Sequence, residues 1–419
     1  MSFSDWKPYK LGDIAEVVGG GTPSTTKSDY WGEKYPWLTP RDLSNYTQRF
    51  ISRGERNITE LGLKNSSAKL VPKGTVLLTS RAPIGYLAIA SNEVCTNQGF
   101  KSFIVDEKKA SNEFLFYLLK QNVEVLKQLG TGTTFAEISA TTIRNLEFPF
   151  PDLKTQQRIA AILSSLDDAI ELNQQINNTL EEMAKAIFKE WFVDFNFPNA
   201  IGKLQETEIG KIPVGWKVAT FEDVFDADRG LSYKGAGLAL AESEATPMHN
   251  LNSVLEGGGY KTIGIKYYSG EYKDKHIVNA GEVIVANTEQ GHKYMLIGYP
   301  AIVPQFYGEH GIFSHHIYRL RPKANCYLSP DFIFHLLLQP QVRDQVVGFA
   351  NGTTVNMLKI EGLKKPKFAM PPKELAEKFG AIAKANRLQA EQNIEENQSL
   401  INLRDTLLPK LMKGEININ

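Results

Sequence analysis

Apolar residues recur with a helical period between residues 153 and 195. They follow one another at alternating steps of three and four, with one asparagine among them: Ile159, Ile162, Leu166, Ala169, Asn173, Ile176, Leu180, Met183 and Ile187. This heptad repeat predicts a long helix whose apolar seam packs against a partner helix.

A second helical pattern begins at Pro371 and supplies that partner within the same chain. At one constant offset the two stretches align as follows: Asn173 with Asn393, Asn177 with Asn397, Leu180 with Leu400 and Ile187 with Leu407. An asparagine in an apolar seam costs stability but fixes register, so we assign Asn173 and Asn393 this role. The alternative is that each faces solvent on a helix whose seam is shifted.

The segments between the helices are repeated too. The opening residues Trp6, Lys7, Leu11 and Asp13 recur as Trp216, Lys217, Phe221 and Asp223, and the run NEFLFYLLK at 112–120 resembles PDFIFHLLL at 330–338. The chain therefore reads as one plan used twice. We expect a globular domain at 1–152, a long helix at 153–196, a linker and second globular domain at 197–370, and a second long helix at 371–419.

Inside the first globular domain, strand and helix patterns are mixed. Apolar and β-branched runs at 71–80, 86–90 and 101–105 predict strands, and 112–129 predicts a helix. The expected fold class is α+β, with two globular domains of mixed α and β structure joined by two long antiparallel helices. The copies diverge at 19–57, 229–268 and 288–316, which we interpret as loops that read different targets on a shared scaffold.

Composition narrows the class of protein. The 419 residues are 42% hydrophobic and 22% charged, with 47 basic and 47 acidic side chains. We expect a cytoplasmic protein, because no apolar run could span a bilayer and no leader pattern opens the chain. Cys95 and Cys326 do not occupy equivalent positions, so a disulfide or cysteine metal site is not expected. Neutral charge means that any DNA would be held by local patches.

Catalytic motifs are missing from the sequence. The glycines at 19–21 are not followed by the Gly-Lys-Ser/Thr of a phosphate loop, and no HExxH or CxxC pattern occurs. His315 and His316 are adjacent, a poor geometry for joint ligation of one metal. We predict no catalytic residue and no metal site in this chain.

The combined motifs resemble the specificity subunit of type I restriction-modification enzymes. They are WKPYKLGDIAEVVGGGTP, TSRAPIG, NQGF, PFPDLKTQQRIAAILSSLDDAI, FKEWFVDF, IPVGW and LRDTLLPKLMKGEI. The second globular domain departs from the pattern, since LSYKGAG replaces the GGGTP loop. The resemblance implies two target recognition domains, each reading one half of a split, asymmetric DNA site.

The resemblance also implies partners. Two methyltransferase subunits would methylate adenine with S-adenosylmethionine, and two restriction subunits would use ATP and Mg²⁺, while this chain would bind no cofactor. We expect the outer face of the first helix near Lys185–Phe192 to hold the methyltransferase subunits.

Residues that could contact DNA are polar side chains on the variable loops. Arg and Lys suit guanine edges, Asn and Gln suit adenine, and Ser and Thr suit phosphate. In the first domain the candidates are Thr22, Ser24, Lys27, Tyr30, Arg41, Arg81, Asn97, Gln98, Lys101 and Thr133. In the second they are Arg229, Tyr233, Lys234, Asn287, Gln290, His292, Lys293, His315, His316 and Asn356. Arg81 and Asn97 could instead support the local turns.

Two other functions remain open from the sequence. The chain could be a coiled-coil scaffold that binds proteins and no DNA, which its neutral charge favours slightly. It could also be a nuclease or methyltransferase itself, against which the missing motifs argue.

The helix length predicts how far apart the two half-sites lie. A helix from Thr155 to Phe192 is about 57 Å long, and two readers on one face of B-DNA would contact half-sites about 34 Å apart between centres. Inserting or deleting one helical turn in either helix should change the preferred spacer and leave the half-sites unchanged. Sequencing of methylated adenines in cells carrying the gene measures both the spacer and the half-sites. Altered half-sites would contradict the prediction that helix length sets only the distance between them.

Overall fold

A computed structural model describes residues 6–132, 136–239, 245–290, 293–352, 355–416 and 418. The chain forms two compact units. The first unit consists of Met1–Asn173 and Glu396–Asn419, and the second of Gln174–Glu395. Each unit thus contains part of both long helices, α6 (Leu153–Phe192) and α10 (Lys373–Met412). The helices are not separate domains, and α6 ends at Phe192, before the linker residues that we had included in it.

The first unit is built on two sheets. A five-stranded sheet has the order β2-β10-β7-β8-β4 and a four-stranded sheet the order β5-β3-β9-β6, while β1 pairs with β11. The strands are β1 Lys7–Lys10, β2 Ala15–Gly19, β3 Trp31–Leu38, β4 Phe50–Ile51, β5 Arg56–Ile58, β6 Leu70–Val71, β7 Val76–Ser80, β8 Ile84–Ala90, β9 Val94–Thr96, β10 Phe100–Val105 and β11 Glu147–Phe150. Short helices are α1 Leu11–Ile14, η2 Ser28–Tyr30, η3 Pro40–Leu43, α2 Glu60–Lys64, α3 Asn112–Gln121, α4 Val123–Gln128 and α5 Ala140–Asn145.

The predicted strands and helix of the first unit are present with two changes. The expected strand at 71–80 is interrupted at Gly74, whose φ of +88° makes a turn between β6 and β7. The expected helix at 112–129 is broken at Asn122, whose side chain donates to the Leu118 carbonyl at 2.7 Å. An asparagine that bonds its own backbone competes with helix continuation. The segment 19–57, predicted as a loop, contains β3 and β4 and the start of β5.

The second unit repeats this arrangement with additional strands. Its sheets have the orders β15-β24-β20-β22, β16-β18-β17-β23-β19 and β21-β26-β25, with the pairs β12-β13 and β14-β27. The strands are β12 Leu204–Thr207, β13 Gly210–Pro213, β14 Lys217–Thr220, β15 Phe225–Arg229, β16 Leu238–Ala239, β17 Thr246–His249, β18 Lys266–Tyr268, β19 Ile277–Asn279, β20 Val283–Ala286, β21 Thr288–Gln290, β22 Pro300–Ile302, β23 His310–Phe313, β24 Ile317–Pro322, β25 Ala350–Asn351, β26 Val355–Leu358 and β27 Lys367–Met370.

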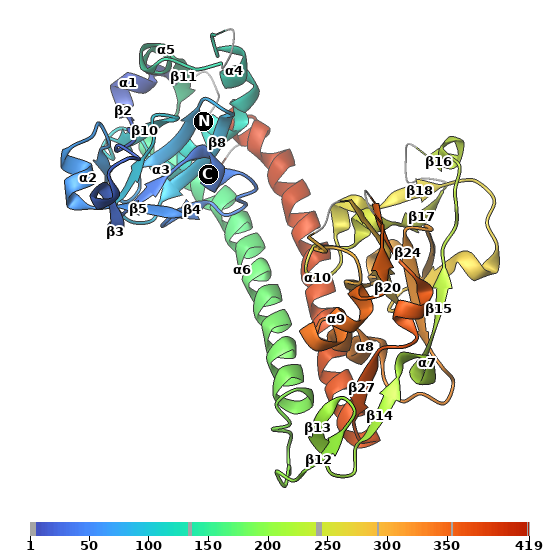
Figure 1. The fold of residues 1–419 in the computed structure, drawn as a ribbon. Helices are drawn as coiled ribbons and strands as arrows, with labels where there is room; N and C mark the ends of the chain where they lie inside the picture. The colour runs from blue at the N-terminus through green and yellow to red at the C-terminus, as the bar shows by residue number, and fades with distance from the viewer. Residues whose placement is uncertain are drawn as a thin grey trace. The chain divides into compact units, whose positions relative to one another are not determined.

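The helices of the second unit are equally short apart from α6 and α10. They are α7 Phe221–Val224, η4 Gly235–Gly237, η6 Leu251–Ser253, η7 Thr262–Gly264, η8 Asp274–His276, η9 Gln305–Tyr307, α8 Pro330–Leu337, α9 Pro340–Val347 and η10 Ile360–Leu363. The expected linker contains the hairpin β12-β13, and the segments 229–268 and 288–316 contain strands as well (Figure 1). Our prediction that the segments 19–57, 229–268 and 288–316 are loops was therefore wrong.

Each unit closes its core with residues from both long helices. In the first unit Ile159 and Leu163 of α6 and Leu411 of α10 belong to the same buried cluster as Phe103 and Phe114. In the second unit the aromatic rings of Phe188 and Phe192 of α6 pack on Phe332 of α8 and Phe379 of α10, with centroids 4.9 to 5.4 Å apart. The helices are therefore part of each core rather than rods attached to it.

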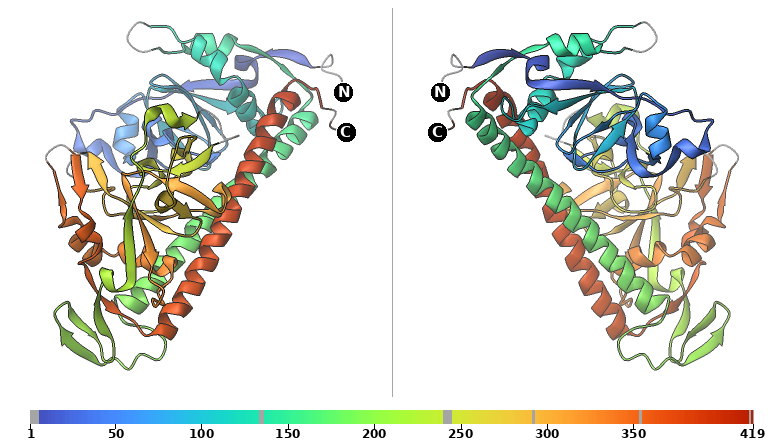
Figure 2. Two further views of the ribbon diagram at one scale, coloured as in Figure 1. Left: turned by 90° about the vertical axis from the view of Figure 1, so that its right-hand side faces the viewer. Right: turned by 90° about the vertical axis from the view of Figure 1, so that its left-hand side faces the viewer.

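Within each unit, α6 and α10 run antiparallel (Figure 2). Asparagine amides join the two helices. In the first unit Asn173 donates to Asn397 at 3.0 Å, and Asn397 donates to the Ile170 carbonyl at 3.3 Å. In the second unit Asn393 donates to Asn177 at 2.7 Å, and Asn177 donates to the Ala390 carbonyl at 3.3 Å. The same exchange thus occurs at equivalent positions of the repeat. Asn173 and Asn393 face the partner helix, not open solvent, and their role in register stays a prediction.

The apolar seam itself was partly misplaced. Ile176 and Met183 are 37% and 49% exposed, although the heptad pattern put them in the seam. The most buried α6 positions instead include Leu163, Ile170 and Phe188. The reason is that α6 packs against both α10 and the globular body, so its covered face is turned relative to a seam that touches one helix only.

A buried histidine makes the second unit sensitive to acid. His249 of β17 is 1% exposed, its Nδ1 lies 2.7 Å from the Tyr260 hydroxyl, and burial lowers its pKa to about 3. The unfolded chain takes up this proton below its ordinary value of 6.5, whereas the folded chain does not. We predict that stability of the second unit falls below that pH, by up to about 1.4 kcal/mol per pH unit from this group.

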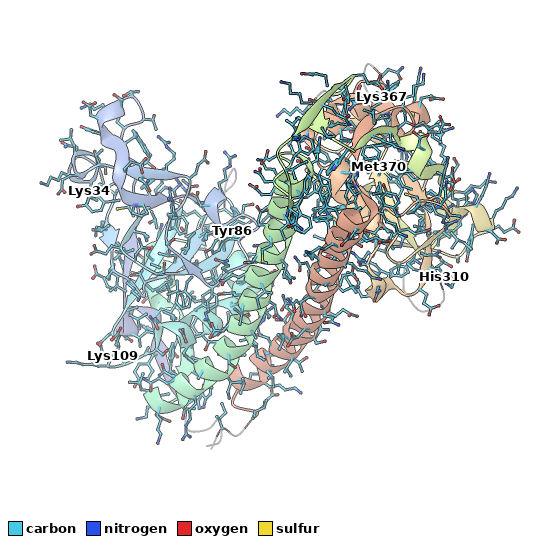
Figure 3. The ribbon with its side chains drawn as sticks, turned by 90° about the horizontal axis from the view of Figure 1, so that it is seen from below. Lys34, Tyr86, Lys109, His310, Lys367 and Met370 are labelled. Atoms are coloured by element: carbon cyan, nitrogen blue, oxygen red, sulfur yellow. The ribbon has the colours of Figure 1, made fainter. Side chains whose placement is uncertain are left out.

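Urea unfolding at several pH values tests this. A His249→Phe chain should be less stable near neutral pH but should lose less stability on acidification. His310→Gln is the control, since His310 is an exposed residue of β23 (Figure 3). A wild-type slope that persists in His249→Phe would refute the assignment.

Candidate nucleic-acid interface

The glycine loop of the first unit is held against the bend at 96–99. A Cβ on Gly20 would lie 2.2 Å from the Asn97 carbonyl oxygen, so only glycine allows this approach. The Gly21 N–H donates to the Thr96 carbonyl at 2.9 Å, and the exposed Thr22 hydroxyl donates to Gln98 Oε1 at 2.5 Å. The backbone contact therefore brings the predicted residues Thr22 and Gln98 together at the surface.

Arg41 lies beside the same bend on η3. A capping box between Thr39 and Asp42 fixes this short helix, and Asp42 Oδ1 also accepts the Glu55 N–H at 2.8 Å. A Cβ on Gly99 would come within 2.9 Å of Pro40 Cγ, which shows how closely η3 approaches the bend. Arg41 is exposed on this short helix.

The rim of this site carries further candidates. Ser24 is exposed and its carbonyl accepts the Trp31 indole N–H at 3.1 Å. The Lys27 ammonium donates to the Tyr30 hydroxyl at 3.1 Å and lies 5.0 Å from the ring centroid. Tyr30 itself is only 7% exposed. Lys27 and Ser24 are thus the surface groups, with Tyr30 beneath them as support.

Lys101 and its neighbours form an internal network. The side chain of Lys101 is 11% exposed and its ammonium lies 3.1 Å from Glu137 Oε1, while Arg81 Nη1 is 3.5 Å from Glu137 Oε2. The Asn97 side chain accepts the Gly99 N–H at 2.8 Å. Lys101 is therefore removed from the proposed DNA surface, because a buried and paired ammonium supports the loops from within. Arg81 and Asn97 are half-buried and have the structural partners that we considered for them.

The second unit builds its surface on the same backbone bonds. A Cβ on Gly230 would lie 2.3 Å from the Ser314 carbonyl oxygen, and the Leu231 N–H donates to the Phe313 carbonyl at 2.7 Å. This reproduces the approach of the loop that begins at Gly20. The bond from Ser80 N to the Gly99 carbonyl, 2.8 Å, likewise corresponds to that from Asn287 N to the His316 carbonyl, 3.1 Å.

Aromatic and basic side chains gather on this frame in the second unit. The ring centroids of His315 and His316 are 3.9 Å apart, and that of Tyr233 lies 6.3 Å from His315. Lys266 donates to the Tyr233 hydroxyl at 3.2 Å. Burial lowers the pKa of His316, and the neighbouring His315, Arg229 and Lys266 lower it further. A neutral imidazole offers both a donor and an acceptor, which suits contact with a base edge.

The other predicted residues divide by exposure. Arg229, Lys234, Gln290 and Lys293 are exposed, whereas Asn287 and Asn356 are 2% and 1% exposed. Asn287 donates to the His315 carbonyl at 3.0 Å and so shapes the histidine pair from beneath. Asn287 and Asn356 are therefore removed from the proposed surface. Thr133 and His292 lie outside the described residues.

Sequence comparison supplies the family. The model of the type I restriction modification DNA specificity domain matches this chain twice, over residues 3–182 and 213–395. The chain belongs to the type I restriction-modification specificity subunits. It is 34% identical over 419 residues to the MjaIX specificity subunit of Methanocaldococcus jannaschii, covering 99% of this chain and 94% of that one. It is 24% identical to the HindI specificity subunit of Haemophilus influenzae, covering 99% and 100%.

A solved structure agrees on the fold. The S subunit of a type I restriction-modification system from M. genitalium matches with a TM-score of 0.64 at 16% identity, covering 99% of this chain and 97% of that one. The specificity-subunit assignment confirms the family resemblance and the repeated α+β plan. It disfavours a coiled-coil scaffold that binds no DNA.

This specificity subunit has two basic residues at its surface clusters that the sequence did not single out. Lys266 contacts Tyr233, and the Arg56 guanidinium lies 3.4 Å from the centroid of Trp31. Both lie within the divergent segments 19–57 and 229–268, but they were not among the basic residues chosen there. The aromatic residues beside them, Tyr267 and Tyr268 in one case and Trp31 and Trp37 in the other, were the available signal.

Within the described parts of the specificity subunit, no group of three His, Cys, Asp or Glu side chains could hold a metal ion. Among the same residues no helix is both long and apolar enough to cross a bilayer.

Arg41 tests the surface of the first unit. Arg41→Ala should weaken DNA binding by the complex of this chain with a methyltransferase partner and lower the dependence of log affinity on log salt by about one. The measurement is fluorescence anisotropy of a DNA duplex that contains the sequence methylated by the complex, at several salt concentrations. Lys108→Ala removes the same charge from an exposed turn of the same unit and should change neither quantity. If sequence preference and the salt dependence of affinity are both unaltered, Arg41 is not part of the DNA interface.

Proposed function

We propose that this specificity subunit reads a split, asymmetric DNA site, one half with each unit. The observation that supports this is one backbone frame carrying two different sets of exposed or half-buried polar side chains. In the first unit the frame presents Thr22, Gln98 and Arg41, and in the second Arg229, Tyr233 and the His315–His316 pair. Two copies of one scaffold with unlike donors and acceptors are suited to unlike half-sites.

We further propose that the chain contributes recognition and its partners contribute chemistry. Methyltransferase subunits would dock on the outer face of α6 near Lys185–Phe192, where Lys189 and Glu190 are exposed while Phe188 and Phe192 lie in the core, and would transfer the methyl group of S-adenosylmethionine to adenine. Restriction subunits, where present, would use ATP and Mg²⁺. Neutral overall charge fits a shared task, because a chain with 47 basic and 47 acidic side chains needs its partners to neutralise much of the phosphate.

The proposal is tested by methyl transfer to DNA. The chain with its methyltransferase partner should methylate adenine within one bipartite sequence, and the chain without the partner should transfer nothing. Sequencing of modified adenines across a genomic library reads out the site. Methylation without sequence preference would contradict the recognition role.

Substitution of one surface tests whether each unit reads one half. Arg229→Ala combined with Lys266→Ala should relax or weaken recognition at one half of the site and leave the other half unchanged, because the cluster lies wholly in the second unit. Lys384→Ala, an exposed α10 residue of the same unit, is the charge control. Equal loss at both halves would oppose the division of labour.

A further inference from the structure

The strongest unassigned feature is a pair of glutamates at equivalent positions of the two long helices. Glu171 of α6 and Glu391 of α10 align at the same offset as Asn173 with Asn393. In the first unit Glu171 Oε1 accepts the backbone N–H of Arg49 at 2.6 Å. In the second unit Glu391 Oε2 accepts the backbone N–H of Gln305 at 3.0 Å. Each helix therefore bonds to the main chain of the globular body in its own unit through the same carboxylate.

The segment held by Glu171 leads to the predicted reading surface. Arg49 immediately precedes β4, and its carbonyl accepts the Ile89 N–H of β8 at 2.8 Å, which ties it to the main sheet. Its guanidinium pairs with Asp168 of α6 and donates to the Tyr117 hydroxyl at 3.2 Å. The chain running back from Arg49 reaches η3 and Arg41 within eight residues. If the Arg49 backbone shifted relative to α6, Arg41 would therefore move with it.

The segment held by Glu391 likewise leads along the chain to the predicted reading surface of the second unit, the pair His315 and His316. Gln305 opens η9, and Tyr307 of η9 donates to the Thr262 carbonyl at 2.7 Å and packs against His249, with centroids 5.9 Å apart. The following strand β23 ends directly before Ser314 and His315. Glu391 is fixed by Arg387 at 2.6 Å, and Arg387 Nε lies 2.7 Å from Asp331 of α8.

Both glutamates stand at cavities, so the close packing between helix and body is interrupted beside each carboxylate. In the first unit a cavity of about 190 Å³ is lined by Arg49, Asp167, Glu171 and Lys120, among others. In the second a cavity of about 250 Å³ is lined by Glu391, Arg387, Asp331 and His335, among others. Close-packed interiors fix orientation through many small contacts, whereas a junction with a cavity depends more on its directional bonds.

We propose that Glu171 and Glu391 are positioning residues that orient each recognition surface on its helix pair, each acting on one half of the DNA site. This rests on the proposed function, since it assigns one half-site to each unit. The two carboxylates touch no base. They act through the backbone of the 44–51 segment and the 303–307 segment.

A first test needs no DNA. In hydrogen exchange on the full chain, Glu171→Ala should lower protection of peptides covering 44–51 and leave 303–307 unchanged, and Glu391→Ala should do the reverse. Glu182→Ala and Glu377→Ala remove the same charge from exposed positions of α6 and α10, where each residue pairs with a neighbouring lysine. Exchange that is unchanged in both segments, or raised throughout the chain, would overturn the proposal.

The second test measures specificity in the complex with the methyltransferase partner. Each Ala variant should reduce kcat/KM on the cognate site by about tenfold, the scale of one hydrogen bond to a charged group. Discrimination should relax at one half-site only, and at opposite halves for the two variants. Glu171→Gln and Glu391→Gln retain an acceptor oxygen and should recover most of the loss.

The two proposals fail differently. If the wild-type complex methylates without sequence preference, the proposed function fails, while the exchange experiment still decides the positioning role. If the wild type is specific and both Ala variants lose activity equally at both halves, or lose only thermal stability, the positioning role fails alone.

Discussion

The pairing of α6 with α10 through asparagine amides is the constraint on which the rest of the structure depends. Apolar seams tolerate sliding by a heptad, because one leucine or isoleucine replaces another. An amide placed between two helices must find its partner or leave a buried polar group unsatisfied, which costs about 1–3 kcal/mol. Asn173 with Asn397, and Asn393 with Asn177, each meet this requirement within one unit. The same amide exchange therefore joins the two antiparallel helices in both units, and we predict that it fixes their register.

In each body one strand pairs with the strand that leads into a long helix. In the first unit β1 pairs with β11, which leads directly into α6, and in the second β14 pairs with β27, which leads into α10. The glycines Gly20 and Gly230 then bring a loop against the main sheet. Scaffold positions are therefore determined by backbone bonds, and the side chains that face outward are free to differ. That separation explains how the two copies keep one frame while presenting arginine and amide groups in one and imidazole and phenol groups in the other.

The sequence predicted the long helices, their pairing and the repeat, because periodicity and internal alignment depend on many residues at once. It misplaced what depends on three-dimensional neighbours. Ile176 and Met183 fit the heptad but are exposed, since the body covers a different face of α6. Strands within 19–57 and 229–268 were read as loops because glycine, proline and aromatic residues interrupt any alternation there. Lys101, Asn287 and Asn356 were chosen for their chemistry, and only packing could show that they lie inside.

The distribution of the chain between the units has a consequence for how the protein is made. The core of the first unit contains Leu408, Leu411 and Met412, which are synthesised after the whole of the second unit. The body at 6–152 therefore leaves the ribosome with part of its apolar surface uncovered and must wait for α10 before its core is complete. A premature stop codon anywhere in the second half of the gene would thus damage the first unit as well, although no residue of its sheets had been lost.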